Sequence, residues 1–320
     1  MISVLPRSQW WNGLLQRYVT GRLRIQPYGE FHEKLKACRR HLEYYRAVSR
    51  QPCEDFNAVE IGTGWFPIIP IGLFLCGARE IWTFDIVGLL REDTFCQVIK
   101  YFCLFAQTGE LNKILPGVRH SALSKLMELA PLATTVSPVD FLEKLNIHGL
   151  VQDIRSSGIA EGSVDMVFSN GVLELLDPTT LAEILAKLRR LASQTSVMSH
   201  YFCMADQFAT FDKSITPFNN LQYSARAWHW LQSPLVPQNR LRISDYRRAI
   251  CEAGFDIFVE ESVNGSESDL ASIRLATEFK HYDQRDLLVI FSWLVGRPVE
   301  CRVNADTCID EPGATAFQVS

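Results

Sequence analysis

The chain has 320 residues, of which 47% are hydrophobic and 21% are charged, and its formal net charge at pH 7 is −4. A chain of this size can bury a full core as one large or two modest domains, without a disulfide or a metal. The slightly acidic balance gives no basic face for a nucleic-acid backbone, so duplex DNA or RNA is not an expected partner.

Membrane-spanning helices and metal sites are also unexpected. The longest apolar runs, residues 66–77 and 287–296, are shorter than the ~20 residues that a spanning helix requires. The first residues lack the basic and apolar regions of a signal peptide. The nine cysteines form no Cys-x-x-Cys pair and the seven histidines no His-x-x-x-His pattern. We therefore expect a reduced, cytoplasmic protein with no membrane contact and no metal.

The N-terminal part of the chain predicts helix and then a change of pattern. Residues 30–45 space their apolar groups at three and four, so residues 1–52 are expected to form an N-terminal helical cap. Residues 57–61 predict a strand, 62–64 a turn, 68–76 an apolar helix ended by Gly77, and 80–84 a strand ended by Asp85. This order is a βαβ unit with parallel strands.

The rest of the chain continues the alternation. Residues 89–145 are mostly helical in pattern, and helices are predicted at 179–192 and 243–253. Strands are predicted at residues 149–152, 163–168, 195–199, 255–260 and 287–294. The pattern predicts one doubly wound α/β domain, residues 53–300, with helices on both faces. Residues 301–320 lack apolar periodicity and are expected to be a loose tail.

Candidate site residues lie where the strands end, because ligands of doubly wound sheets bind outside the carboxyl ends of the strands. After the first strand the sequence has Gly62 and Gly64, which allow a tight turn and close approach of a ligand. A dinucleotide fingerprint needs a third glycine where Pro67 stands. Glu60 would repel a pyrophosphate, whereas it would suit a ligand that carries an ammonium group.

In these residues the sequence resembles the class I S-adenosylmethionine-dependent methyltransferases, whose first motif is an acidic residue, x, Gly, x, Gly. The resemblance implies a seven-stranded sheet and S-adenosylmethionine as cofactor, with Asp85 binding the ribose hydroxyls and Asp153 near the adenine amino group. In this sequence Phe66 stands where a third glycine of the motif is often found. The purely structural alternatives are that Glu60 caps a turn and that Asp85 caps a helix. The residues expected to bind the cofactor are Glu60, Gly62, Thr63, Gly64, Asp85, Ile86, Asp153, Ile154 and Asn170.

The turn after the fourth strand bears on the acceptor. Residues 169–172 read Ser-Asn-Gly-Val, without the Asn/Asp-Pro-Pro-aromatic run of enzymes that methylate exocyclic amines of DNA bases and without a Pro-Cys nucleophile. We therefore expect a small-molecule acceptor, methylated on oxygen or nitrogen in a biosynthetic step. The alternatives are a protein or other macromolecule as acceptor, an inactive module that binds the cofactor, and a dehydrogenase.

His200 is the expected general base, because it stands near the end of the fifth strand and histidine titrates close to neutral pH. We expect it to face the open end of the site; the alternative is a histidine that is hydrogen-bonded in the structure. Asp206 and Glu174 are further catalytic candidates, as bases or as orienting partners of His200.

Residues 201–242 are expected to be an insertion that forms a lid over the acceptor. About forty residues between a strand and a helix exceed the usual connection of ~2–6, and the segment is rich in aromatic residues. Some of these, such as Phe208, Phe211 and Trp230, can equally anchor the insertion. An arginine at its end can clamp an acidic acceptor group or pin the lid to the domain. The residues expected to bind the acceptor are Tyr201, Tyr223, Trp228 and Arg240.

Overall fold

The structure is a computed structural model, which describes residues 25–49, 54–210, 212–232 and 237–299. Most of residues 1–52, expected as a helical cap, are therefore outside the described part: only Pro27–Phe31 (η2) and His32–Val48 (α2) are seen as helix. The expected tail, residues 301–320, and Phe211 also lie outside it.

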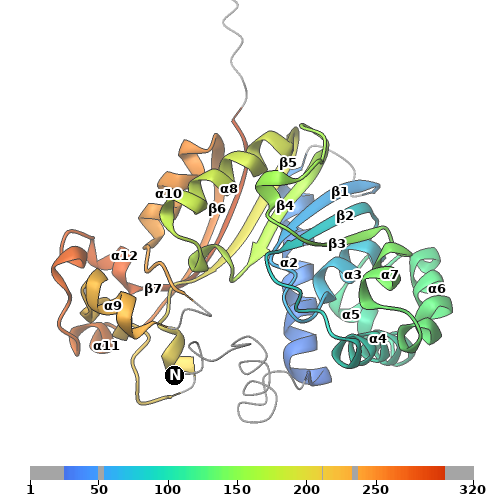
Figure 1. Cartoon of the computed structure of the whole chain (residues 1–320), viewed down its shortest axis with the longest axis horizontal. Helices are drawn as coiled ribbons and strands as arrows, with labels where there is room; N and C mark the ends of the chain where they lie inside the picture. The colour runs from blue at the N-terminus through green and yellow to red at the C-terminus, as the bar shows by residue number, and fades with distance from the viewer. Residues whose placement is uncertain (1–24, 50–53, 211, 233–236, 300–320) are drawn as a thin grey trace, which may run out of the picture.

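Seven strands form one sheet (Figure 1). The strands are Phe56–Ile61 (β1), Ala78–Asp85 (β2), Ile147–Val151 (β3), Val164–Asn170 (β4), Ala192–Cys203 (β5), Phe255–Asn264 (β6) and Val289–Pro298 (β7). Their order is β3-β2-β1-β4-β5-β7-β6. Strands β1 to β5 pair in parallel, and β7 is antiparallel to both β5 and β6. The central strand β1 is buried along its whole length, as expected for a parallel strand covered on both faces.

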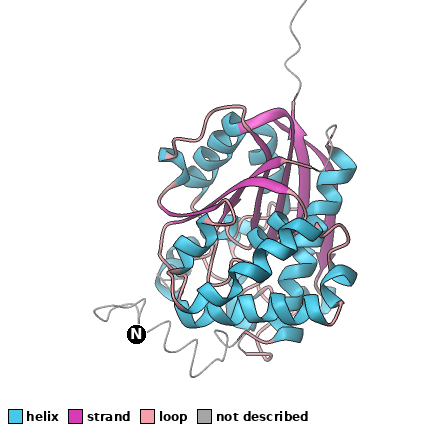
Figure 2. Ribbon diagram, turned by 90° about the vertical axis from the view of Figure 1, so that its right-hand side faces the viewer, coloured by secondary structure: helices cyan, strands magenta, loops and turns pink. Residues whose placement is uncertain are grey.

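Helices cover both faces of the sheet (Figures 1 and 2). On one face lie α2, Ile68–Leu75 (α3), Glu92–Gln107 (α4), Glu110–Ile114 (α5), His120–Leu129 (α6), Ala130–Thr134 (η3) and Pro138–Glu143 (α7). On the other face lie Pro178–Leu191 (α8) and Ile243–Glu252 (α10). Helix α3 is buried on all sides, which explains its uniformly apolar sequence. Helix α8 begins at Pro178 because the Asp177 carboxylate accepts hydrogen bonds from the next free backbone N–H groups.

Two connections that leave the same edge of the sheet pack together, and we call them the lobe. They are the described residues of 204–242 (all but 211 and 233–236), between β5 and α10, and residues 265–288, between β6 and β7. Their helices are Gln207–Thr210 (η6), Asn219–Gln222 (η7), Ala225–Leu231 (α9), Glu267–Ala271 (α11), Thr277–Phe279 (η8) and Gln284–Leu288 (α12) (Figure 1, lower left). A core of its own holds the lobe together, formed by Phe218, Leu221, Leu270, Phe279, Leu287 and Leu288.

The predicted α/β class and the seven-stranded sheet are confirmed, with two corrections to the elements. Strand β5 continues to Cys203, so Tyr201 and Phe202 belong to the sheet and not to the insertion. The lobe also contains residues 265–288, of which the sequence pattern placed only Leu287 and Leu288, in the last strand; both belong to α12, and β7 begins at Val289. Within the described residues, none of the helices has the length and apolar character needed to cross a membrane.

Candidate functional site

The glycine turn after β1 presents its backbone to open space at one position. Gly62 and Gly64 have φ of +84° and +66°, a region that residues with a side chain rarely adopt. The Gly62 N–H donates to the Phe84 carbonyl at 2.7 Å, which fixes the turn against β2. A Cβ on Gly62 would lie 2.3 Å from Cγ2 of Val172, whereas a Cβ on Gly64 would meet nothing within 4 Å. Gly62 is thus required by packing, and Gly64 borders a cradle that a ligand can enter.

Glu60 is a buried carboxyl group directly before this turn, with 3% of its surface exposed. Its Oε2 accepts a hydrogen bond from the Thr83 hydroxyl at 2.7 Å, and Thr83 in turn lies 2.5 Å from the Thr63 hydroxyl. Burial raises the pKa of Glu60 to about 7, although the bond from Thr83 opposes the shift. A cation placed beside this group would be stabilised, because it would replace the hydration that the carboxylate has lost.

Asp85 ends β2 and faces the same turn. Its Oδ2 accepts from the Gly64 N–H at 3.1 Å and its Oδ1 from the Val87 N–H at 3.2 Å. Partial burial raises the pKa of Asp85, and these two bonds oppose the rise. Two apolar side chains stand beside it in solvent, since Ile86 is 76% exposed and Val151, at the end of β3, is 61% exposed. The strand ends therefore combine a carboxylate with an uncovered apolar surface.

Asp153 follows β3, as expected, but its carboxylate is already engaged. It accepts from the Arg155 side chain at 2.6 Å and from the Arg155 backbone N–H at 2.9 Å, which lowers its pKa. Arg155 also pairs with Glu183. Ile154, the first residue of the turn Ile154–Ser156 (η4), is buried. Contact between Asp153 and an adenine stays a prediction. Such a contact would compete with the ion pair between Asp153 and Arg155.

Asn170, the last residue of β4, contacts a histidine that the sequence analysis did not single out. Its Oδ1 lies 3.1 Å from Nε2 of His41, whose Nδ1 lies 2.8 Å from the Ser199 hydroxyl. His41 is fully buried, and burial lowers its pKa to about 3. The available signal was its place in α2, where it shares the apolar face with Cys38 and Leu42.

His200 does not face the open end of the site, so that expectation is wrong. Strand β5 extends three residues beyond it, and its ring is fully buried with Nδ1 2.8 Å from the Ser169 hydroxyl. His200 lies on the same face of β5 as Met198 and Phe202, which belong to the core under α8 and α10. Burial lowers the pKa of His200 to about 3, so this imidazole is neutral and a poor proton acceptor. His200 is therefore not assigned as the general base.

The other two catalytic candidates have no hydrogen bond to His200, so neither orients it. Asp206 is buried and accepts from the Phe208 N–H at 2.8 Å and from Nδ2 of Asn219 at 2.7 Å, which holds the first turn of the lobe. Glu174 lies in the short helix Leu173–Leu175 (η5). Its Oε1 accepts from the Cys203 N–H at 3.1 Å, and burial raises its pKa to about 8.

The expected acceptor residues divide into two groups. Tyr201, on β5, is half-buried and its ring lies 5.2 Å from that of Trp293. Trp228 and Arg240 are buried inside the lobe: the Trp228 Nε1–H donates to the Gln238 carbonyl at 3.0 Å. Tyr223 stacks on Trp228 with ring centroids 6.2 Å apart.

Arg240 holds the lobe together and does not point to a ligand. Its Nη2 donates to Oε1 of Glu278 at 2.8 Å and its Nη1 to the Asn220 carbonyl at 3.0 Å, and its guanidinium lies over the rings of Trp228 and Phe279. These partners all belong to the lobe, so Arg240 joins its two connections to each other; pinning of the lobe to the sheet domain is not seen for this residue.

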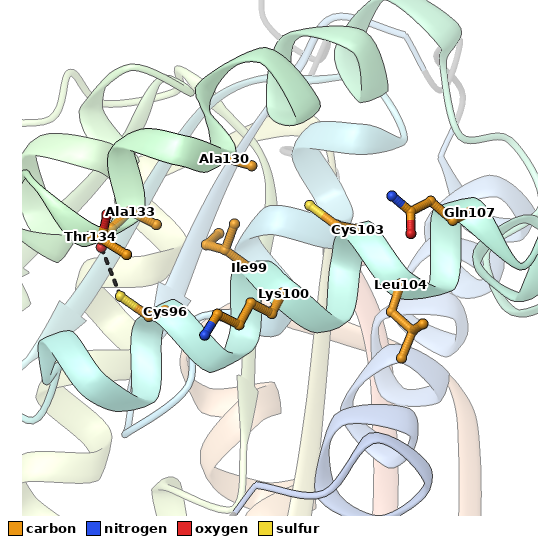
Figure 3. Close-up of a pocket in the computed structure, with 9 residues that line it drawn as sticks. All are labelled: Cys96, Ile99, Lys100, Cys103, Leu104, Gln107, Ala130, Ala133 and Thr134. Atoms are coloured by element: carbon orange, nitrogen blue, oxygen red, sulfur yellow. Dashed lines mark hydrogen bonds between the residues drawn. The ribbon is translucent and has the colours of Figure 1, made fainter.

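Two hollows lie away from the strand ends. One, of about 460 Å³, is on the lobe and is lined by residues between Glu267 and Leu287, among them Arg274, Lys280 and Tyr282. The other, a groove of about 190 Å³, lies between α4 and η3 (Figure 3). It is lined mainly by small and apolar side chains and two thiols, of which Cys96 donates to the Ala133 carbonyl. It contains none of the candidate residues. In the described parts of the chain, no group of three His, Cys, Asp or Glu side chains can hold a metal.

Comparison with known proteins gives similarity at the level of structure only. No family model and no curated protein matches the chain. A putative methyltransferase from Haloferax volcanii, solved in complex with the activator Trm112, is 13% identical with a TM-score of 0.43, over 84% of this chain and 93% of that one. Magnesium protoporphyrin IX methyltransferase from Synechocystis PCC 6803, with bound SAH, is 12% identical with a TM-score of 0.44, over 82% of each chain. Geranyl diphosphate C-methyltransferase from Streptomyces coelicolor is 10% identical with a TM-score of 0.44, over 81% of this chain and 78% of that one.

Proposed function

We propose that this protein is an S-adenosylmethionine-dependent methyltransferase of class I that methylates a small-molecule acceptor on oxygen or nitrogen in a biosynthetic reaction. The observation that carries the proposal is the arrangement of Glu60, Gly64 and Asp85. These residues stand at the ends of two adjacent strands, around a backbone turn that borders open space. A ligand with an ammonium group, a pair of hydroxyls and a flat apolar base would satisfy all of them.

Each residue has a definite task in this assignment. The buried Glu60 carboxylate would bind the ammonium group, because an opposite charge favours its ionised form. The Gly64 backbone would allow the ligand to approach closely, and Asp85 would accept hydrogen bonds from the two ribose hydroxyls. Ile86, which is 76% exposed, would cover a face of the adenine. A methyl sulfonium bound here supplies an electrophilic methyl group, and the protein contributes chiefly by holding the acceptor in line with it.

Two observations disfavour a dinucleotide as the ligand. Glu60 would repel a pyrophosphate at the position where dinucleotide-binding folds place one. The sheet also departs from the 3-2-1-4-5-6 order of those folds, since the antiparallel β7 lies between β5 and β6. A dehydrogenase is therefore a weaker assignment than a methyltransferase.

The lobe supports a small acceptor. Both of its connections leave the edge at which β1, β2 and β4 end: Cys203 at the end of β5 pairs with Phe291, and Asn264 at the end of β6 pairs with Val289. A compact lobe with its own core at this edge is suited to enclose a small molecule, since ligand sites are concave and mostly apolar.

Calorimetric titration tests the proposal directly. We expect S-adenosylhomocysteine (SAH) and S-adenosylmethionine to bind at one site with micromolar affinity and NAD to show no binding. Asp85→Ala should weaken SAH binding, whereas Asp212→Ala, a change of an exposed aspartate in the lobe, should not. Absence of SAH binding to the folded wild-type chain, or tighter binding of NAD, would overturn the assignment.

A further inference from the structure

The turn that follows β4 joins the cofactor cradle to the end of β5. Val172 packs against Gly62, because its Cγ2 occupies the place of a Cβ there. Two residues later, Oε1 of Glu174 accepts the Cys203 N–H from β5. The Gly171–Val172 turn and Glu174 thus lie next to the cradle, at the ends of β4 and β5, and this is where an acceptor would lie if the proposed function holds.

Two polar atoms at this position are enclosed and have no hydrogen-bond partner among the described residues. They are Oε2 of Glu174 and Nδ2 of Asn170, which stand on either side of the Gly171–Val172 turn. Glu174 itself is only 3% exposed. Such atoms are rare in folded proteins because an unpaired buried polar group is costly. One is a hydrogen-bond donor, and the other is a carboxyl oxygen that can accept or donate.

The side chains around Glu174 are electrically neutral at physiological pH. Burial raises the pKa of the Cys203 thiol to about 12, and it also raises the pKa of the phenols of Tyr201 and Tyr246. These three are the titratable groups that interact with Glu174 from β5 and α10.

Three arginines, Arg40, Arg240 and Arg242, have partners of their own. Arg240 is paired with Glu278, and Arg242 donates to backbone carbonyls, among them that of Leu287 at 2.9 Å. Arg40, which lies over the Trp293 ring, is paired with Glu261. Arg240 and Arg40 therefore offer an anionic acceptor no unpaired cation, whereas the enclosed Nε of Arg242 has no hydrogen-bond partner among the described residues.

Aromatic side chains stand beside Asn170, which pairs with Tyr201 across β4 and β5, and we call them the Tyr201 wall. The rings of Tyr201 and Phe291 stack at 6.0 Å with an angle of 12° between their planes, and Trp293 lies next to Tyr201. All three belong to the paired strands β5 and β7. Aromatic side chains of this kind bind flat apolar groups and leave hydrogen bonding to a few placed polar atoms.

From these contacts we propose that the acceptor is a neutral aromatic molecule with a hydroxyl group, bound between Glu174 and Asn170 against the Tyr201 wall. This inference rests on the proposed function. The Asn170 amide donates to the acceptor oxygen and Glu174 accepts its proton. In the reaction the O–CH₃ bond forms while the S–CH₃ bond breaks with its electron pair on sulfur, and the hydroxyl proton passes to the Glu174 carboxylate and then to solvent.

Phenol is the probe for this inference, in protein saturated with SAH, with binding measured by ligand-observed NMR and calorimetry. We expect phenol to bind in the millimolar range and both benzoate and benzylammonium to bind at least tenfold more weakly. Glu174→Gln keeps a hydrogen-bond acceptor atom, so its affinity for phenol should stay within about threefold of wild type. Glu174→Leu should lower this affinity at least tenfold. Glu161→Leu, at an exposed site, is the control. All variants should bind SAH within about twofold of wild type.

The proton-accepting role has a separate readout. With S-adenosylmethionine and phenol, anisole formation should rise as pH increases from 6.5 to 9, because only the ionised form of Glu174 accepts a proton, and Glu174→Gln should lower it at least tenfold. Equal phenol binding by wild type and Glu174→Leu, preferred binding of benzoate, absence of anisole, or full activity of Glu174→Gln would each overturn the inference. Loss of SAH binding by wild type would instead overturn the proposed function.

Discussion

Gly64 and Asp85 are 21 residues apart in sequence and are joined by a hydrogen bond of 3.1 Å from the glycine N–H to the aspartate Oδ2. The bond places the only carboxylate at the end of β2 directly beside the turn after β1. Within this turn Gly62 is packed against Val172, whereas Gly64 borders open space.

Asp85→Ala should reduce SAH affinity by about five- to 150-fold, which corresponds to the loss of roughly 1–3 kcal/mol of hydrogen bonding. Calorimetry on the folded variant measures the change. Asp177→Ala is a matched control, because this aspartate caps α8 and its loss should cost about 1 kcal/mol of stability without changing SAH affinity. Equal SAH affinities for wild type and Asp85→Ala would remove Asp85 from the site.

SAH affinity should rise as pH increases from 5.5 to 7.5. The ligand ammonium requires Glu60 in its ionised form, and burial places the pKa of this group at about 7 in the free protein. The Glu60→Gln variant cannot ionise at this position, so its SAH affinity should be weaker and nearly independent of pH over the same range. A parallel pH dependence in wild type and Glu60→Gln would show that another group controls binding.

The two glycines of the turn should respond differently to alanine. Gly62→Ala places a methyl group 2.3 Å from Val172 and should destabilise the fold by roughly 1–3 kcal/mol, with partial recovery when Val172→Ala is added. Gly64→Ala meets no neighbour, so it should cost only about 1 kcal/mol from its positive φ yet reduce SAH affinity at least tenfold. Urea unfolding and calorimetry separate the two effects. Unchanged SAH affinity in Gly64→Ala would mean that the cradle is not used.

Arg240→Gln should loosen both halves of the lobe together. The substitution removes the ion pair with Glu278, which connects residues 204–242 with 265–288, and the bond to the Asn220 carbonyl, which lies within residues 204–242. Hydrogen exchange should accelerate in both segments and stay unchanged in β1, β2 and β4, and SAH affinity should remain within about twofold. Arg247→Gln, at the more exposed pair with Glu260, is the control. Faster exchange in one segment alone would show that the lobe is not a single unit.

His41→Gln should change how stability responds to acid. Burial lowers the pKa of His41 from 6.5 to about 3, so the unfolded chain binds the extra proton between these values and the histidine destabilises the fold as pH falls below 6.5. The advantage of wild type over the variant in free energy of unfolding should therefore shrink by about 1 kcal/mol between pH 6.5 and 5.5. Only the difference is informative, because the raised pKa values of Glu60 and Glu174 act in the opposite direction. A constant difference across this range would mean that His41 is not held neutral.

The sequence by itself determined the fold class and the strand-end candidates. Alternation of apolar strands with amphipathic helices has only one common solution, a doubly wound sheet, and the carboxyl ends of its parallel strands must meet at one edge. The positions of Glu60, Gly62, Gly64 and Asp85 at that edge follow from local pattern alone. Local signals sufficed there because each residue is placed by the strand that immediately precedes it.

Only the tertiary structure decided where His200 and Arg240 point. A strand's true end depends on its neighbours, and β5 continues past His200 because β4 and β7 supply hydrogen-bond partners as far as Tyr201 and Cys203 respectively. Arg240 finds Glu278 across 38 residues, a pairing that no local pattern contains.

Local pattern likewise does not predict how Glu174, Asn170 and Tyr201 come together. The unpaired atoms of Glu174 and Asn170 arise from the burial of segments that are distant in sequence, and burial shifts a pKa only through the complete set of neighbours. Residue type and spacing therefore locate the cofactor side of the site, while the acceptor side depends on how β5, β7 and the lobe pack around the end of β4.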